Sequence, residues 1–223
     1  MKRLLIVLIA TGILALSACA PIAQPDTTTA PPETTAAPVE TTAPEQETTL
    51  SEEDPLVAEI RELLTFTKDA DPWYNYALKS YYDEPAGIDI FQLVYNAPWL
   101  DLELTQAEKD FLISKELDIE TSTVHKYPVE KIDEVLQKHF GITFDETVGV
   151  GLDKMVYNPD TDSYYHLHGD FEAAYPVISE VETREDGGVT VYYRQGETGE
   201  SCAIMLQMTE SGKYKILSNV VLE

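Results

Sequence analysis

Two histidines and an aspartate that lie close together form the most enzyme-like pattern in the sequence. His166 and His168 are two residues apart, and this spacing places both side chains on the same face of a β-strand. Two imidazoles on one face can share a metal ion, and Asp170 can act as a third ligand or orient one of the histidines. The pattern therefore predicts a metal-assisted hydrolase site. The simpler alternative, which we favour, is that both histidines lie on the solvent-facing side of a strand that ends at Gly169, so that Asp170 points elsewhere.

Three oxygen-bearing side chains precede the histidines at the spacing of a calcium-binding loop. Asn158, Asp160 and Asp162 match the first three ligand positions of such a loop. The position that requires glycine holds Ser163, however, and the position of the closing glutamate holds Gly169. The segment is therefore interpreted as an acidic turn between two strands. The sequence predicts no cofactor, and only weak binding of a divalent cation is left open.

Other residue types that can do chemistry have simpler interpretations. The aromatic stretch from Trp73 to Tyr82 offers rings for stacking on a sugar, but aromatic residues at helical spacing are more typical of a core. Cys202 has no activating neighbour in the sequence, so a buried, inert thiol is predicted. The residues next to His125 in the sequence do not indicate a role for it. The sequence contains no Gly-x-Ser-x-Gly, His-Glu-x-x-His, Ser-x-x-Lys or phosphate-loop motif. Acyl-transfer, zinc-protease and nucleotide-binding activities therefore have no local signature.

The elements that must position these residues are predicted to be helices first and strands afterwards. Helix starts are expected at Asp54-Pro55, Asp71-Pro72, Thr105 and Pro128, because each offers a capping side chain or an early proline. Gly141 is expected to end the last helix. The expected strands form three pairs, at residues 154–157 and 164–168, 177–182 and 189–194, and 203–208 and 214–221. This order predicts an α+β domain with helices on one face of an antiparallel β-meander, for which the cystatin-like fold is an analogy.

The residue pattern at the N-terminus predicts an export signal. Met1-Lys2-Arg3 is followed by an apolar run from Leu4 to Leu16, which is shorter than the roughly 18 to 20 residues of a membrane-spanning helix. Leu16-Ser17-Ala18-Cys19 resembles the lipobox of bacterial lipoproteins. That resemblance implies that residues 1–18 are a signal peptide and that Cys19 carries acyl chains, such as palmitate, as the first mature residue. It also implies export and lipid anchoring at the outer face of the bacterial cytoplasmic membrane. The alternatives are a short transmembrane anchor and an ordinary signal peptide.

Residues 19–50 are predicted to comprise the lipidated Cys19 and a disordered tether. The segment is rich in threonine, proline, alanine and glutamate and contains no aromatic residue. It cannot bury enough apolar surface to offset the entropy lost on ordering. Its expected role is to space the following domain from the membrane, and the sequence leaves glycosylation of the threonines open.

Residues 51–223 are predicted to form one acidic globular domain. They carry 13 basic and 35 acidic residues, a formal charge of −22. Such a surface disfavours nucleic acid as a partner and favours cations, although an acidic, soluble exterior is a sufficient explanation. Because Cys202 is the only cysteine of this domain, no internal disulfide is expected.

Residues 70–220 resemble small, uncharacterised α+β domains of lipoproteins from Gram-positive bacteria. The resemblance is carried by residues 164–170, Tyr-Tyr-His-Leu-His-Gly-Asp, and by residues 212–219, Gly-Lys-Tyr-Lys-Ile-Leu-Ser-Asn; it implies no particular activity. The leading hypothesis is a membrane-anchored domain of the cell envelope that binds a protein or cell-wall partner and has no enzymatic activity. The alternatives are the hydrolase that uses His166, His168 and Asp170, and a small solute-binding lipoprotein, for which the domain is small.

Overall fold

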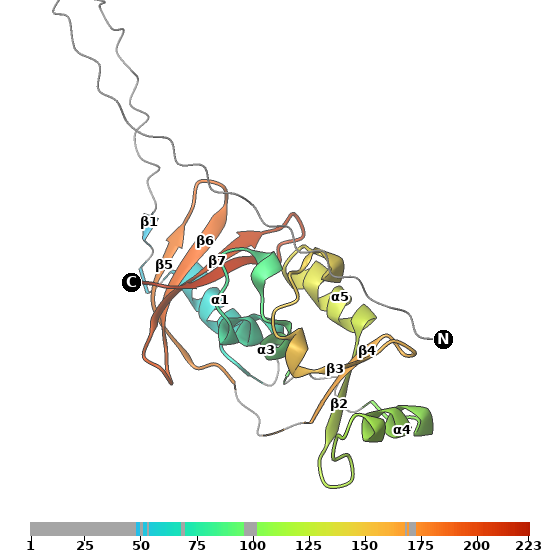
Figure 1. Cartoon of the computed structure of the whole chain (residues 1–223). Helices are drawn as coiled ribbons and strands as arrows, with labels where there is room; N and C mark the ends of the chain where they lie inside the picture. The colour runs from blue at the N-terminus through green and yellow to red at the C-terminus, as the bar shows by residue number, and fades with distance from the viewer. Residues whose placement is uncertain are drawn as a thin grey trace, which may run out of the picture. The chain divides into compact units, whose positions relative to one another are not determined.

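Helices occupy most of the first part of the described chain and strands most of the second (Figure 1). The structure is a computed structural model, and it describes residues 48–49, 51–52, 54–67, 70–95, 102–167, 169 and 173–223. These residues belong to one compact unit, which extends from Pro44 to Glu223. The predicted signal peptide, Cys19 and nearly all of the predicted tether lie outside the described residues.

The helical elements of the described residues are α-helices and short 3₁₀ helices. The α-helices are α1 (Pro55–Leu64), α2 (Trp73–Tyr76), α3 (Ile90–Val94), α4 (Gln106–Ser114) and α5 (Val129–His139). The 3₁₀ helices are η1 (Ala77–Lys79), η2 (Pro85–Gly87), η3 (Phe144–Glu146) and η4 (Leu152–Lys154).

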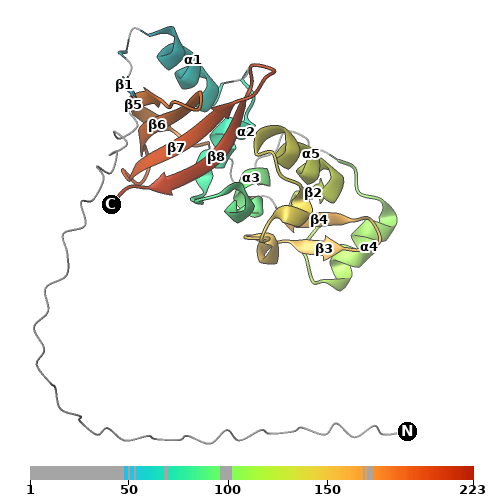
Figure 2. The same ribbon diagram turned by 90° about the horizontal axis from the view of Figure 1, so that it is seen from above.

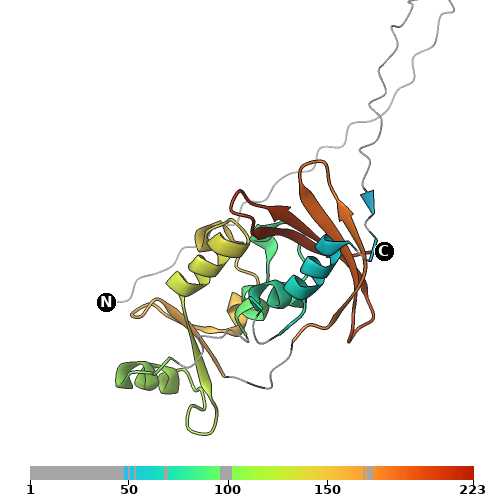
Figure 3. The ribbon, with the colours of Figure 1, turned by 180° about the vertical axis from the view of Figure 1, so that it is seen from behind.

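The predicted start of the first helix is confirmed by its cap. The Asp54 carboxylate accepts a hydrogen bond of 2.8 Å from a backbone N–H of the first turn, and Pro55 occupies the first helical position, where no N–H is needed. Val57, Ile60 and Leu64 are the buried residues of α1 and share one face. They join the core that α1 forms with the five-stranded sheet (Figure 3).

The aromatic stretch forms less helix than the sequence predicts. Only Trp73–Tyr76 is α-helical, and η1 continues the turn to Lys79. Each side chain from Trp73 to Leu78 is buried, so packing on all sides, rather than helix propensity, determines this backbone. The prediction that the rings belong to the core is confirmed, because Tyr82 is buried as well. Tyr81 is the exception: its ring is 41% exposed.

The predicted boundaries of the later helices are confirmed. Thr105 and Glu108 form the capping box at the start of α4, with both reciprocal hydrogen bonds present. Pro128 immediately precedes α5. Gly141 lies just beyond the end of α5 with a φ of 74°, and its N–H donates to the Leu136 carbonyl at 2.9 Å. This left-handed conformation ends the helix at little cost because glycine has no Cβ.

The strands form two antiparallel sheets. The first sheet has the order β1-β5-β6-β7-β8 and the second the order β2-β4-β3. The strands of the first sheet are β1 (Thr48–Thr49), β5 (Pro176–Thr183), β6 (Gly188–Gln195), β7 (Ser201–Met208) and β8 (Tyr214–Val221). Those of the second are β2 (Val124–Pro128), β3 (Val156–Asn158) and β4 (Ser163–Leu167). Since β5 to β8 follow one another along both chain and sheet, the predicted α+β fold with an antiparallel meander is confirmed.

The first predicted hairpin differs in detail from the prediction. Its strands β3 and β4 pair with each other but not with β5, because β2 takes the other side of β4. β2 was not predicted, since its sequence Val-His-Lys-Tyr-Pro contains few of the apolar residues that usually mark a strand. The side chains of β2 alternate in burial rather than in apolar character: His125 and Tyr127 are buried, whereas Lys126 is half-buried.

Helices cover one face of the five-stranded sheet. Buried residues of β5 to β8, such as Val191, Ile204 and Ile216, join residues of α1, α2, α3 and α5 in one apolar cluster. Seen from above, β7 and β8 present their other face away from these helices (Figure 2). The register of the long strands is therefore set by one buried face.

Candidate functional site

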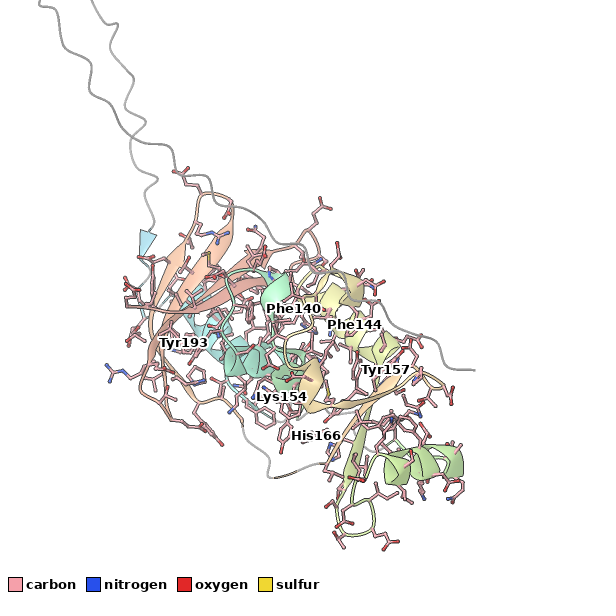
Figure 4. All side chains as sticks on the ribbon, in the orientation of Figure 1. Phe140, Phe144, Lys154, Tyr157, His166 and Tyr193 are labelled. Carbon is pink, nitrogen blue, oxygen red and sulfur yellow. The ribbon has the colours of Figure 1, made fainter. Side chains whose placement is uncertain are left out.

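His166 lies in β4, where its ring is held by aromatic side chains. The His166 ring is half-buried, with its centroid 4.7 Å from that of Phe91 in an edge-to-face arrangement and 5.6 Å from that of Tyr95. The Lys154 ammonium lies 5.2 Å from the centre of the same Phe91 ring; His166 and Lys154 are both labelled in Figure 4. The other two predicted ligands, His168 and Asp170, lie outside the described residues.

A second histidine, which sequence reasoning did not connect with the first, is the neighbour of His166 across the sheet. His125 of β2 is directly opposite His166 in the antiparallel register, so both side chains emerge on one face with Cβ atoms about 5 Å apart. His125 is buried, with 6% of its surface exposed. The sequence did not indicate that these two histidines are neighbours, because their pairing requires β2, a strand that was not predicted. Within the described ranges, no group of three or more His, Cys, Asp or Glu side chains is arranged to hold a metal ion.

The acidic turn joins β3 to β4. The Asn158 side-chain oxygen accepts a hydrogen bond from the Asp160 N–H at 3.0 Å, and the Asp162 carboxylate accepts one from the Tyr157 hydroxyl at 2.8 Å. Asp162 has a φ of 44°, a left-handed conformation that aspartate tolerates better than most residues. These contacts agree with the interpretation of the segment as a turn between two strands.

Glu108, in α4, forms a deeply buried charged contact with the three-stranded sheet. Its Oε1 accepts hydrogen bonds from the Lys126 ammonium at 2.6 Å and the Tyr165 hydroxyl at 2.5 Å. Its Oε2 accepts from both the N–H and the hydroxyl of Thr105, each at 2.8 Å. Only 1% of Glu108 is exposed. Thus α4, β2 and β4 meet at one carboxylate whose two oxygens each accept two hydrogen bonds.

The environment of Glu108 fixes its charge. Burial by itself raises the pKa of this carboxyl, but the Lys126 ammonium and the donors from Tyr165 and Thr105 lower the pKa to about 2. Burial and the nearby carboxylate raise the pKa of Tyr165 to about 12. At neutral pH the carboxylate is therefore ionised and the phenol protonated. Neither group is poised to exchange a proton in this pH range, so the cluster is suited to structure rather than to acid–base catalysis.

Two hollows share Glu130 in the first turn of α5, and the first of them lies beside this cluster. The first measures about 480 Å³ and has Lys126 in its lining, so it borders the Glu108 ion pair. Its lining residues are Leu102, Glu103, Lys126, Pro128, Glu130, Lys131 and Glu134. The second also measures about 480 Å³ and is lined by Val129, Glu130, Asp133, Thr143, Phe144, Asp145 and Asp162. Both volumes are within the range of small-molecule sites.

His139, at the end of α5, is a buried histidine that the sequence analysis did not single out. It is 1% exposed and packs edge-to-face on Tyr74, with ring centroids 5.2 Å apart. Its Nε2 is 3.6 Å from the Asp71 carboxylate. Burial lowers the pKa of His139 to about 4, opposed by Asp71 and assisted by Lys138 and Lys213. The ring is therefore neutral at pH 7 and behaves as a core side chain.

Cys202 lies in β7 and is completely buried. Its thiol donates to the Glu200 carbonyl, 3.7 Å from Sγ, and the side chains of Tyr81 and Tyr193 also lie within hydrogen-bonding reach. Buried thiols in such surroundings are shielded from oxidants and electrophiles. The predicted burial is confirmed.

The predicted lipidation site, Cys19, lies outside the described residues, and so does the preceding apolar run. Among the helices that the structure does describe, none has both the length and the apolar content needed to cross a bilayer. Comparison with known proteins gives no further guide: the chain matches no family model, no curated protein and no solved structure. The cystatin-like analogy and the resemblance to lipoproteins therefore stay predictions from the sequence.

Proposed function

We propose that this protein is a lipid-anchored, extracytoplasmic domain that binds a partner in the cell envelope without enzymatic activity. The observation that carries the proposal is the pair of hollows that share Glu130. The first hollow borders Lys126, the ion-pair partner of Glu108, whose hydrogen-bonded carboxylate holds the surrounding elements together rather than exchanging protons. Apolar side chains such as Leu102 and Pro128 line the first hollow together with charged ones, a combination typical of binding surfaces.

The anchor in this proposal is the lipobox, Leu16-Ser17-Ala18-Cys19. Two acyl chains on Cys19 give stable membrane attachment, because each buried methylene contributes about 0.8 kcal/mol and one chain alone is marginal. Replacement of Cys19 by alanine is expected to abolish acylation and to move the chain from the membrane fraction to the medium, or to leave it unprocessed. Cys19→Ala protein that stays with membranes at its mature length would contradict the anchor.

The binding role is tested by photo-crosslinking in intact cells. A photoreactive residue in place of Glu130 is expected to give a defined adduct with a protein or cell-wall component. The same residue in place of Glu197, which is exposed in the turn after β6, serves as the control and should give none. Equal labelling from both positions, or no adduct from either, would contradict a partner at the hollows.

A metal-assisted hydrolase that uses His166, His168 and Asp170 is a second candidate. It is favoured by one observation, the position of His125 directly across the sheet from His166, since adjacent strands can supply two imidazoles to one zinc ion. Metal analysis of the purified chain, with thermal unfolding in the presence of zinc, tests it. Bound zinc that is lost in both His125→Asn and His166→Asn would support a metal site, whereas zinc-free protein with no thermal shift would exclude it.

A further inference from the structure

The second of the two hollows has walls that are tied to one another. It lies between the first turn of α5, the 3₁₀ helix η3 and the turn that joins β3 to β4, and it measures about 480 Å³. The Phe144 N–H donates to the Asp133 carboxylate at 2.6 Å, which connects η3 to α5. The Val129 N–H donates to the Asp162 carbonyl at 3.0 Å, which connects α5 to the β3–β4 turn. Contacts within the protein therefore fix the shape of this hollow, as is usual for small-molecule sites.

The lining of this hollow is acidic and contains no basic side chain. The four carboxylates in it are those of Glu130, Asp133, Asp145 and Asp162. Within the described ranges, the carboxylates of Glu130 and Asp145 form no hydrogen bond or ion pair. No group of three or more acidic, histidine or cysteine side chains among the described residues is arranged to hold a metal ion, so these four carboxylates do not converge on one point. A ligand with positive charges and hydrogen-bond donors at separate positions therefore fits the hollow better than a single ion.

Three aromatic rings, which we call the aromatic row, adjoin the hollow. The ring of Phe144, which lines the hollow, has its centroid 6.1 Å from that of Tyr164. The Tyr164 ring in turn lies 4.9 Å from that of Tyr157, its neighbour across the paired strands β4 and β3. The Tyr157 hydroxyl donates to the Asp162 carboxylate at 2.8 Å, so the row meets the hollow a second time at Asp162.

The aromatic row is partly open to solvent. Tyr157 is 43% exposed, and Phe144 and Tyr164 are half-buried; Phe144 and Tyr157 are both labelled in Figure 4. Aromatic rings at a surface offer a large, rigid apolar area. The apolar face of a sugar ring, which is formed by its C–H groups, can stack on such an area.

We propose that the hollow and the aromatic row bind an oligosaccharide that carries free amino groups. This proposal rests on the proposed binding function and names the class of ligand. A sugar ring presents an apolar face together with hydroxyl groups around its edge, so stacking on Tyr157 would place donors beside the Asp162 carboxylate. Protonated amino groups on neighbouring sugars would lie beside Glu130 and Asp145. Charge complementarity favours an amino sugar over a neutral or acidic one.

Other ligands match only part of this surface. A divalent cation needs several oxygen ligands around one point and makes no use of the aromatic row. A linear polyamine or a lysine-rich peptide would neutralise the carboxylates but presents no sugar ring to Tyr157 and Tyr164. A neutral oligosaccharide would stack on these rings but would leave Glu130 and Asp145 without an opposite charge.

The test uses the full chain in detergent and three probes, with binding measured by isothermal titration calorimetry at a pH at which the amino groups of the probes are protonated. The first probe is a linear tetramer of glucosamine. The second is the tetramer of N-acetylglucosamine, which has the same rings without the charge, and the third is spermine, which has the charge without the rings. We expect the glucosamine tetramer to bind at least about tenfold more tightly than either of the others. Added salt should weaken this binding, because it screens the contact between amino groups and carboxylates.

Two variants separate the charge from the rings. Asp145→Asn removes one carboxylate and Tyr157→Leu removes one ring, and each should weaken binding of the glucosamine tetramer by about fivefold or more. Tyr157→Phe keeps the ring and should retain most of the affinity. The matched controls are Glu197→Gln, in the exposed turn after β6, and Tyr175→Leu, at a tyrosine that is 61% exposed before β5. Both controls should leave binding unchanged.

Three results would overturn the proposal. The first is a glucosamine tetramer that does not bind, or that binds equally well to Asp145→Asn and Tyr157→Leu. The second is spermine that binds as tightly as the tetramer, which would indicate a site for amines without stacking. The third is an N-acetylated tetramer that binds as tightly, which would show that the carboxylates take no part. A crosslink from Glu130 to a protein in intact cells would still support the proposed function in each case, so the two failures are distinguishable.

Discussion

The two sheets of this protein differ in the contacts that stabilise them against their helices: mainly apolar packing in one, and a buried ion pair in the other. In the five-stranded region, defined as β5–β8 with α1, α2, α3 and α5, apolar side chains from sheet and helices form one continuous cluster. In the three-stranded region, defined as β2–β4 with α4, Tyr127 belongs to that cluster, but Leu112 and Tyr165 are fully buried outside it. On that side of the sheet, Glu108 joins α4, β2 and β4. A small sheet with one short helix buries little apolar surface, so a hydrogen-bonded ion pair helps to define its arrangement.

The largest effect is expected when that ion pair is broken. Glu108→Ala leaves the Lys126 ammonium half-buried without its counter-ion and removes the acceptor for Tyr165 and Thr105. Removing one partner of a buried pair costs about 3–5 kcal/mol, and hydrogen exchange should show the loss in β2, β4 and α4. Urea unfolding measures the total.

A matched variant separates the charge from the packing. Glu108→Leu combined with Lys126→Met should recover the part of the stability that Glu108→Ala loses through the unpaired Lys126 ammonium, because apolar residues of similar volume often replace a buried ion pair without loss. The part lost with the acceptor for Tyr165 and Thr105 should not return, since leucine accepts no hydrogen bond. As a surface control, Glu134→Gln breaks the exposed contact with Lys131, whose atoms are 2.7 Å apart, and should change stability by less than about 1 kcal/mol. A loss of similar size in Glu134→Gln and Glu108→Ala would remove the distinction between the regions.

The corresponding change in the five-stranded region is Ile204→Ala. Ile204 is fully buried in β7, and truncation of such a side chain costs about 2–4 kcal/mol through lost transfer energy and a cavity. Exchange should accelerate across β6, β7 and β8 together, since these strands share the apolar cluster. Met208→Ala, at the 43% exposed end of the same strand, is the control. If Ile204→Ala destabilised only the three-stranded region, the apolar cluster would not be the basis of the sheet.

The same contrast explains what the sequence could predict. Asp54, Thr105 and Gly141 act through their immediate neighbours, so the helix boundaries that they set were predicted correctly. The long strands β5–β8 were predicted because apolar residues and glycine-containing turns mark them. β2 was not, since its burial depends on contacts with β4 and α4 that are distant in sequence.

The candidate site was predicted less well for the same reason. His125 meets His166 through strand pairing, and Lys126 meets Glu108 across two elements. Neither contact has a local signature. Thr105 and Glu108 were identified as a capping box, but sequence alone gave no reason to connect that box with Lys126 or Tyr165.

Acid should affect the two regions in different pH ranges. Burial lowers the pKa of His139 from its usual 6.5 to about 4, so the unfolded chain takes up a proton first. The contribution of neutral His139 to the free energy of unfolding is therefore complete above about pH 6.5 and is lost as the pH falls toward 4. The upper limit of this contribution is about 3.5 kcal/mol, because the pKa differs by about 2.5 units and each unit corresponds to about 1.4 kcal/mol. Glu108 has its pKa lowered from 4.5 to about 2, so its contribution is present above about pH 4.5 and is lost toward pH 2.

Urea unfolding at pH 7, 5 and 3, with hydrogen exchange at each pH, separates these ranges. His139→Phe keeps a ring between Trp73 and Tyr74 but cannot ionise, so it should flatten the decline between about pH 6.5 and 4. It should leave the decline at lower pH unchanged. A variant that loses stability with the same pH dependence as the unmodified chain would show that His139 does not cause the first decline.

The smallest losses of stability are expected when the N-cap residues of two helices are replaced: Asp54 of α1 in the five-stranded region and Thr105 of α4 in the three-stranded region. Asp54 caps α1 with one hydrogen bond, and Asp54→Ala should cost about 1 kcal/mol. Thr105 also caps α4, but its hydroxyl and N–H additionally bind the Glu108 carboxylate. Thr105→Ala should therefore cost more, about 2 kcal/mol, and should weaken the Lys126 contact as well. In a double-mutant cycle, Thr105→Ala should couple to Lys126→Met, whereas Asp54→Ala should not. Equal costs and no coupling would mean that Thr105 acts only as a helix cap, and that it does not contribute to the contact between Glu108 and Lys126.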